Sequence, residues 1–453
     1  MSYPPQLSYF LDRVSGFSTN TFKLFPQNAV TASPNQIVRF TLPNNSLLNL
    51  KSFAFRFSAS TTGVDAIARL PDDISTLIER VEVTSSGVQL AAGANFYNVL
   101  KQAMSALKGD SCDPVLGHPS MVRERSYVDG AAKAGNEEYT GSSALFSIDK
   151  WEGFLGSSGP GILDSSLLGE LVISLTLADN NVLSSSAGIT LSGTTGTTDF
   201  DNLGNKASAY SLSNMYATVE AMSLASSGYD EMIQGIISEV GFLEIPFKQY
   251  MSFQDTVSQQ MRFSTATQSL DRIIVVHRDA DYNTVAAPRT VAGYKVYDAT
   301  NILGGVASYD AGGVLDTNKE LYKPAFSNFK EPTPAGGTVL GHQFQINGAN
   351  LPNYQASTED MFSITRNAVG IHHAQKKMGL DTMRKHFCVY AVRLNLPNSE
   401  ENRIISGLDT RGTNLSAYYN IFNIGPTKPV VNLFCEMTSS LRVGAGGQLE
   451  VIN

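Results

Sequence analysis

The sequence predicts an all-β protein made of two β-sandwiches in tandem, and three observations support this fold class. The chain has 453 residues but only 16% charged residues, so the residues that favour helices are scarce. Short segments in which apolar and polar residues alternate recur along the chain, separated by turn-forming residues. The order of these predicted elements in the first half is repeated in the second. A chain of this length is expected to form two or three domains.

The clearest strand of the first half carries three phenylalanines at alternate positions. Phe53, Phe55 and Phe57 are separated by Ala54 and Arg56, and a period of two places the rings on one face of a strand. Such a row can be a stacking surface for nucleic-acid bases, but in a sandwich strand it is typical of core. We therefore expect the three rings inside the first sandwich.

Each half contains one predicted helix. In residues 94–108, apolar residues recur at i, i+4, i+7 and i+11 from Phe96, which is one face of a helix. In residues 357–370, Ser357 followed by Asp360 resembles a capping box, and apolar residues continue at helical spacing. Both helices precede the last strands of their half.

The two halves correspond segment by segment. After the helices, the predicted counterparts are 143–150 with 386–396, 169–178 with 413–424, and 211–223 with 430–442. The correspondence is one of layout, without residue-level identity. It predicts two sandwiches of the same topology.

These segments define the expected organisation of the chain. Residues 1–20 are expected to be an N-terminal arm, 21–228 the first sandwich and 229–453 the second, with the linker at Ala225-Ser226-Ser227-Gly228. The arm is either a short helix that reaches a neighbouring subunit or a frayed terminus. Residues 183–212 and 279–336 are rich in small and polar residues and are expected to be long surface loops.

Charge and cysteine content exclude several classes. A net charge of −8 argues against a protein whose main task is binding the phosphate backbone. Three cysteines without a CxxC pair indicate neither a disulfide framework nor a zinc site. The N-terminus does not resemble a signal peptide, and no apolar run is long enough for a membrane span.

A search for chemistry predicts no catalytic, cofactor-binding or metal site. None of the six histidines lies in a metal-binding motif. His277-Arg278-Asp279 has the same three residues as the catalytic triplet of kinases, and we attribute this match to chance. The adjacent acid pairs Asp72-Asp73 and Glu137-Glu138 would point to opposite faces of a strand, so they are poor catalytic pairs. The single Trp151 is expected in a core or a subunit interface.

The basic stretch 366–386 leaves three interpretations open. It is either an inward face that contacts nucleic acid or an acidic partner, a pH-sensitive contact between subunits, or a solvated loop.

Three runs resemble the double-jelly-roll major capsid proteins of DNA viruses, the lineage of Polinton-like viruses, virophages, large nucleocytoplasmic DNA viruses and adenovirus hexon. They are 342–354, 406–416 and 434–447. The resemblance implies two tandem jelly rolls that assemble as a homotrimer with a pseudo-hexagonal base and tile an icosahedral shell. It also implies contacts with neighbouring capsomers and with penton and minor capsid proteins, without sequence-specific nucleic-acid binding. The loops at 183–212 and 279–336 would then face outward.

The resemblance places the protein in the virion, made in the host cytoplasm or nucleus and not secreted. One alternative is a glycan-binding or spike-like β-sandwich surface protein, which needs an exposed aromatic cluster or calcium-binding acids. Another is an extracellular hydrolase, which needs an export signal and paired carboxylates.

Overall fold

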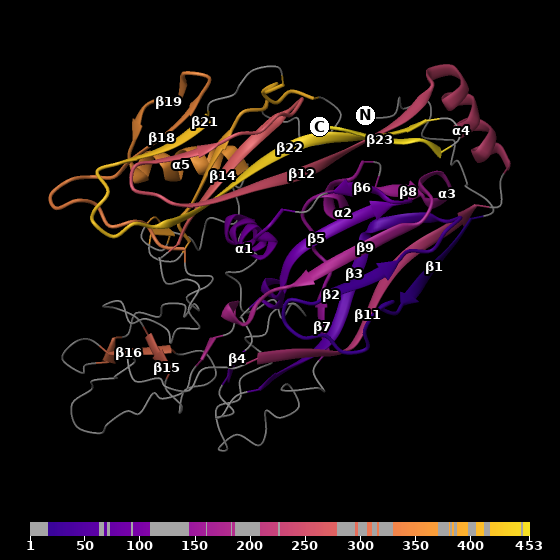
Figure 1. Ribbon diagram of the computed structural model, residues 1–453, viewed down its shortest axis with the longest axis horizontal. Coiled ribbons are helices and arrows are strands. Elements are labelled where there is room, and N and C mark those ends of the chain that lie inside the picture. The colour runs from indigo at the N-terminus through magenta and orange to yellow at the C-terminus, as the bar shows by residue number, and fades with distance from the viewer. Residues whose placement is uncertain are drawn as a thin grey trace, which may run out of the picture.

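Two antiparallel β-sandwiches lie side by side in the computed structural model (Figure 1). The structure describes residues 17–62, 68–69, 73–91, 94–108, 145–159, 161–182, 184–185, 209–224, 227–278, 295–297, 306–309, 315–316, 329–369, 380, 383–384, 387–396, 405–411, 417–444 and 447–453. The predicted all-β class with two tandem sandwiches is confirmed.

Eight strands form the two sheets of the first sandwich. They are β1 (Phe17–Leu24), β2 (Ile37–Thr41), β3 (Leu47–Thr62), β5 (Ile78–Ser85), β6 (Val88–Ala91), β7 (Leu145–Ile148), β9 (Leu171–Leu177) and β11 (Ala209–Leu224). One sheet has the order β1-β11-β3-β7 and the other β2-β9-β5-β6. Numbered in chain order, the eight strands therefore form sheets 1-8-3-6 and 2-7-4-5, which is the jelly-roll topology.

The second sandwich repeats this topology strand for strand. Its strands are β12 (Phe242–Thr256), β13 (Gln260–Phe263), β14 (Leu270–Arg278), β18 (Gly341–Ile346), β19 (Ala349–Ala356), β20 (Val389–Arg393), β21 (Ala417–Phe422) and β22 (Val430–Gly444). The sheet orders are β12-β22-β14-β20 and β13-β21-β18-β19. The predicted correspondences are confirmed, because β7 matches β20, β9 matches β21 and β11 matches β22.

The two predicted helices occupy equivalent places. Helix α1 (Tyr97–Lys108) follows β6, and α5 (Thr358–Val369) follows β19. In α5 the Ser357 hydroxyl accepts a hydrogen bond from the Asp360 amide, and the Asp360 carboxylate accepts one from the Ser357 amide. This reciprocal pair is the capping box that the sequence predicts.

A third long helix, α4 (Ser227–Val240), joins β11 to β12. The sequence interpretation placed only a linker and a domain boundary here. The helix is consistent with the spacing of Met232, Ile233, Ile236 and Ile237, which the preceding Ser- and Gly-rich residues obscured. Its Ile237 is buried, whereas Ile236 and Val240 are exposed.

Short elements complete the described chain. In the first half they are β4 (Ala68–Arg69), the 3₁₀ turn Ile74–Leu77, α2 (Phe154–Ser157), β8 (Ile162–Asp164), α3 (Ser165–Leu168), the turn Asn180–Val182 and β10 (Ser184–Ser185); in the second they are β15 (Lys295–Tyr297), β16 (Val306–Tyr309), β17 (Leu315–Asp316) and β23 (Leu449–Ile452). Residues 17–20, which were assigned to the N-terminal arm, belong to β1. The rest of the arm, and most of 183–212 and 279–328, lies outside the described residues.

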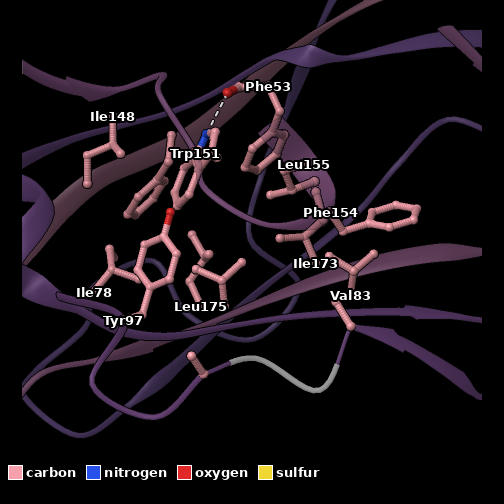
Figure 2. Packing of buried hydrophobic residues seen from close by; sticks show 14 of the residues in the cluster. Phe53, Ile78, Val83, Tyr97, Ile148, Trp151, Phe154, Leu155, Ile173 and Leu175 are labelled. Atoms are coloured by element: carbon pink, nitrogen blue, oxygen red, sulfur yellow. Dashed lines mark hydrogen bonds between the residues drawn. The ribbon is translucent and has the colours of Figure 1, made fainter. Parts of the chain in front are cut away.

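The core of the first sandwich contains the predicted phenylalanine row. Phe53, Phe55 and Phe57 are fully buried, so they are core and not a base-stacking surface. Trp151 lies against Phe53 and Tyr97 (Figure 2) and donates a hydrogen bond from its indole nitrogen to the Phe53 carbonyl at 2.8 Å. The single tryptophan therefore ties β3 to the segment before α2.

Replacing Trp151 with phenylalanine is expected to destabilise the protein by about 2–4 kcal/mol. The change removes a buried donor from the Phe53 carbonyl and leaves unfilled volume beside Tyr97. Urea unfolding followed by circular dichroism measures the loss. The exposed Val339 supplies a control, because Val339→Ala is expected to change stability by less than about 0.5 kcal/mol.

The sheet β12-β22-β14-β20 is covered on both faces. Val431, Leu433 and Cys435 of β22 belong to the core between the two sheets of the second sandwich. Phe434 and Leu441 of the same strand belong instead to the core cluster of the first sandwich. The two sandwiches therefore share a continuous apolar junction, beside which α1 lies (Figure 1).

Candidate functional site at the junction of the two sandwiches

Two of the six histidines meet in the core of the second sandwich. His277 on β14 and His342 on β18 flank the hydroxyl of Tyr419 on β21, at 3.0 Å from His277 Nε2 and 2.9 Å from His342 Nδ1. The Cys388 thiol lies 3.5 Å from His277 Nδ1. All four side chains are fully buried, so solvent and a substrate are excluded from this cluster.

Burial keeps these groups neutral. Loss of hydration, together with the repulsion that a protonated His342 would exert, places the pKa of His277 well below its usual value. Burial lowers the pKa of His342 to about 3 and raises the pKa values of Tyr419 and Cys388. A deeply buried cluster without an accessible reactive group has a structural role. The change expected in it is protonation of the histidines at low pH.

A second polar network lies on the face of the β12-β22-β14-β20 sheet that points toward the first sandwich. Arg272 donates two hydrogen bonds to Glu436, from Nη2 at 2.7 Å and from Nε at 3.0 Å. The Tyr250 hydroxyl donates to the same carboxylate at 3.3 Å. Glu436 is fully buried, so its charge depends on these partners.

Lys248 extends this network along β12. Its ammonium lies 2.6 Å from the Asp271 carboxylate and 2.8 Å from the Thr438 hydroxyl. Asp271 occupies a register shift between β14 and β22, because Leu270 pairs with Met437 and Arg272 with Glu436. The extra residue turns its carboxylate toward Lys248, which the regular alternation of the strand would not allow.

A cavity of about 560 Å³ opens beside these ion pairs, between the two sandwiches. It is lined by Lys51, Met104, Glu152, Gly156, Ser157, Ser158, Gly159, Gly161, Lys248, Tyr250, Arg272, Val369, Arg393, Asn395, Leu396 and Glu436. The first sandwich and the segment around α2 form one wall, and the second sandwich forms the other. The arrangement can bind a charged ligand but presents no nucleophile paired with a base.

The other candidate residues of the sequence are dispersed. Asp73 caps the turn Ile74–Leu77 by accepting a hydrogen bond from the Ser75 amide at 2.9 Å. In the basic stretch 366–386, Arg384 pairs with Glu331 at 2.5 Å, and most of the remainder lies outside the described residues. Asp72, Asp279, the pair Glu137-Glu138 and the other four histidines lie outside them as well.

The described residues contain no group of side chains that could hold a metal ion and no helix long and apolar enough to cross a membrane.

Sequence reasoning missed both polar networks. The signal for the junction was a charged residue inside an apolar strand, as at Arg272 before Ile273 and at Glu436 within β22. A charge in a buried strand requires a partner. The histidine cluster had no comparable signal, because His277, His342 and Tyr419 lie on three strands that are distant in sequence and Cys388 lies just before a fourth.

The strand order and the duplication define the double-jelly-roll fold, and comparison with solved structures shows the same fold over the full chain. The PBCV-1 protein VP54, fitted into a reconstruction of the virophage Sputnik, gives a TM-score of 0.59 at 13% identity and covers 98% of both chains. The Faustovirus major capsid protein gives 0.56 at 9% identity, over 98% of this chain and 93% of its own. At these identities the likeness shows the fold.

Sequence comparisons add no closer relative. No protein-family model matches the chain, and no curated protein matches its sequence. The fold is therefore recognised from structure, and function must be argued from the molecule.

Proposed function

We propose that this chain is the major capsid protein of an icosahedral DNA virus, located in the virion and without enzymatic activity. The observation that carries the proposal is the duplication of one eight-strand topology within a single chain. Two fused sandwiches per subunit allow three subunits to present six similar sandwiches, and this number suits a hexagonal lattice. Full-length likeness to the Faustovirus major capsid protein supports the same role.

The surface of the first sandwich supports self-association. Four large apolar side chains are exposed within a short part of the chain, namely Phe22, Phe25, Val30 and Ile37. Phe25 is 67% exposed and Val30 is 84% exposed. Exposed apolar side chains that form a patch are typical of protein contacts, and we propose that these four, which lie close together in the sequence, form one. We assign this region, called here the β1–β2 edge, to the contact between subunits of a homotrimer.

Further partners follow from the same role. A shell built from trimers needs contacts between neighbouring capsomers and with penton and minor capsid proteins. The exposed Ile236 and Val240 of α4 are available for such contacts. Sequence-specific nucleic-acid binding is not part of the proposal, because the net charge of −8 opposes binding to the phosphate backbone.

Light scattering coupled to size-exclusion chromatography tests the proposal. The purified protein is expected to elute as a particle of three times 48.8 kDa, and negative-stain images are expected to show a pseudo-hexagonal outline. A monomer that binds glycans would contradict the capsid role and support a surface-binding protein.

The double variant Phe25→Ser, Val30→Ser is expected to dissociate the trimer while leaving the fold of each chain intact. Both side chains are exposed in the isolated chain, so their loss is expected to leave the fold of that chain unchanged, while the variant loses the stabilisation that subunit association gives the native state. Light scattering measures the mass, and the circular dichroism spectrum shows whether the chain is folded. The conservative pair Phe25→Leu, Val30→Ile keeps the apolar contact and is expected to remain trimeric. A fully trimeric serine variant would show that the contact lies elsewhere.

A further inference from the structure

We propose that the cavity at the junction of the two sandwiches binds a compact polyanion of the phosphate class, such as a short polyphosphate. Its volume of about 560 Å³ lies in the range of small-molecule pockets, roughly 300–1,000 Å³. The cavity is thus large enough for several phosphate groups and too small for a folded partner. The proposal concerns ligand binding by the isolated chain and does not depend on the capsid role.

Cationic side chains reach this cavity from both sandwiches. Lys51 on β3 belongs to the first, whereas Lys248, Arg272 and Arg393 lie on β12, β14 and β20 of the second. Lysine and arginine side chains that converge from separate elements are the usual binding groups for phosphate oxygens. Two of the four already have ion pairs, Lys248 with Asp271 and Arg272 with Glu436, so a ligand depends chiefly on Lys51.

The carboxylates that line the cavity are already paired. Glu436 accepts both hydrogen bonds of Arg272, and Glu152 lies 3.8 Å from the ammonium of Lys101. Lys51 is exposed and has no hydrogen-bond or ion-pair partner within the part of the chain that the structure describes. Its charge is therefore available to a ligand, and its exposure places it where the cavity opens to solvent.

Ser158 supplies an independent indication of a ligand. It lines the cavity and is only 1% exposed, yet its hydroxyl oxygen has no hydrogen-bond partner among the described residues. A buried hydroxyl without a partner costs about 1–3 kcal/mol. The oxygen is covered in this structure, so rotation of the Ser158 side chain toward the cavity would be needed before an anionic ligand oxygen could accept this hydrogen bond and remove the cost.

The backbone amides next to Ser158 are not available to bind the ligand. The amides of Ser157, Ser158 and Gly159 donate to the carbonyls of Gly153, Phe154 and Pro246. Recognition therefore rests on side chains, namely the Ser158 hydroxyl and the surrounding cations. Gly161 leaves room beside Lys51, since even a Cβ at this position would lie 3.7 Å from the Lys51 side chain.

Binding is expected to stabilise the junction. A ligand held by side chains of both sandwiches binds the folded chain and not the unfolded one, so it raises the unfolding temperature by mass action. Tripolyphosphate is the probe, at constant ionic strength near about 0.15 M, where nonspecific surface attraction is screened. The full-length protein is expected to unfold at a higher temperature with tripolyphosphate than with chloride of equal ionic strength, and calorimetry is expected to give one site per chain.

Three variants distinguish a built site from surface charge. Lys51→Gln is expected to weaken tripolyphosphate binding by about tenfold or more, because it removes a charged donor. Ser158→Ala is expected to weaken it by a smaller factor. Lys428→Gln removes an exposed lysine that does not line the cavity and is expected to bind as the wild type does.

The outcomes decide the proposal. Lys51 is exposed, so Lys51→Gln is expected to unfold at the same temperature as the wild type without ligand, and a loss of binding then cannot come from misfolding. The proposal is overturned if millimolar tripolyphosphate gives neither heat nor a thermal shift. Equal binding by the wild type and Lys51→Gln overturns it too, as does equal weakening by Lys51→Gln and Lys428→Gln.

Discussion

Lowering the pH from about 7.5 to about 5 is expected to destabilise the protein by about 2 kcal/mol for each of His277 and His342. Burial places the folded-state pKa of His277 well below its usual value and lowers the pKa of His342 to about 3. In the unfolded chain both imidazoles titrate near the ordinary value of about 6.5. Between these limits the unfolded state binds more protons, so stability rises with pH and is lost as the pH falls below about 6.5.

The geometry of the histidine cluster explains why protonation of His277 or His342 costs free energy. The Tyr419 hydroxyl joins the two ring nitrogens, at 3.0 and 2.9 Å, and has one proton to donate. Neutral imidazoles satisfy this arrangement because the hydroxyl can donate to one and accept from the other. Protonation would turn both nitrogens of a ring into donors and place a charge in a fully buried site.

The test compares the wild type with His277→Gln, His342→Asn by urea unfolding at both pH values. Each amide keeps a polar group near the nitrogen that contacts Tyr419 but does not titrate. The double variant is expected to be less stable near neutral pH, yet to lose about 4 kcal/mol less on acidification. Surface carboxylates contribute equally to both proteins, so they cancel in the comparison. Equal losses would show that the buried histidines do not control acid stability.

Much of the fold was predictable because strands and helices follow from local patterns of apolar and capping residues in the sequence. The alternation of Phe53, Phe55 and Phe57 indicated a core strand, and the cap at Ser357 indicated α5. The order of strands in the sheets was not predictable, because β3 pairs with β11 across more than 150 residues, as at Tyr216 and Arg56. Pairing at such separation depends on how two apolar faces close over each other, which no local pattern specifies.

The site was predictable only where a residue broke its local pattern. Glu436 stands out in an apolar strand, but its partner Arg272 is 164 residues away, so the sequence shows the need for a partner without its identity. The cavity depends on the junction of two sandwiches and on the register shift at Asp271, which follow from tertiary packing alone. The helix α4 was missed for the opposite reason: its apolar spacing was present, but Ser and Gly residues before it were taken as a linker.

The substitution Arg272→Met is expected to destabilise the protein by about 3–5 kcal/mol. It removes both short hydrogen bonds from Glu436, a fully buried carboxylate. The remaining partners are weaker, with the Tyr250 hydroxyl at 3.3 Å and the Lys248 ammonium at 4.0 Å. The cost therefore comes chiefly from a buried charge left without its main partner, and urea unfolding measures it.

The double variant Arg272→Met, Glu436→Leu separates the cost of an unpaired buried charge from the net contribution of the ion pair to the free energy of unfolding. Removing both charges is expected to restore most of the lost stability, because apolar side chains of similar size also fill a buried site. Arg411 provides the control: it pairs with Asp409 at 2.8 Å, but both side chains are about half exposed. Solvent screens such a pair, so Arg411→Met is expected to leave stability unchanged. A double variant no more stable than Arg272→Met alone would contradict this account.

Because the pair lies at the junction, its loss in the second sandwich is expected to change the unfolding of the first sandwich as well. Trp151 is the only tryptophan, and it lies in the core of the first sandwich, whereas Arg272 and Glu436 lie in the second. Because Phe434 and Leu441 of the second sandwich pack into the first core, the two sandwiches are expected to unfold together. Arg272→Met should then shift the Trp151 fluorescence transition as far as the transition followed by circular dichroism. A fluorescence midpoint that stays at the wild-type value would instead mean that the two sandwiches unfold independently despite their shared core.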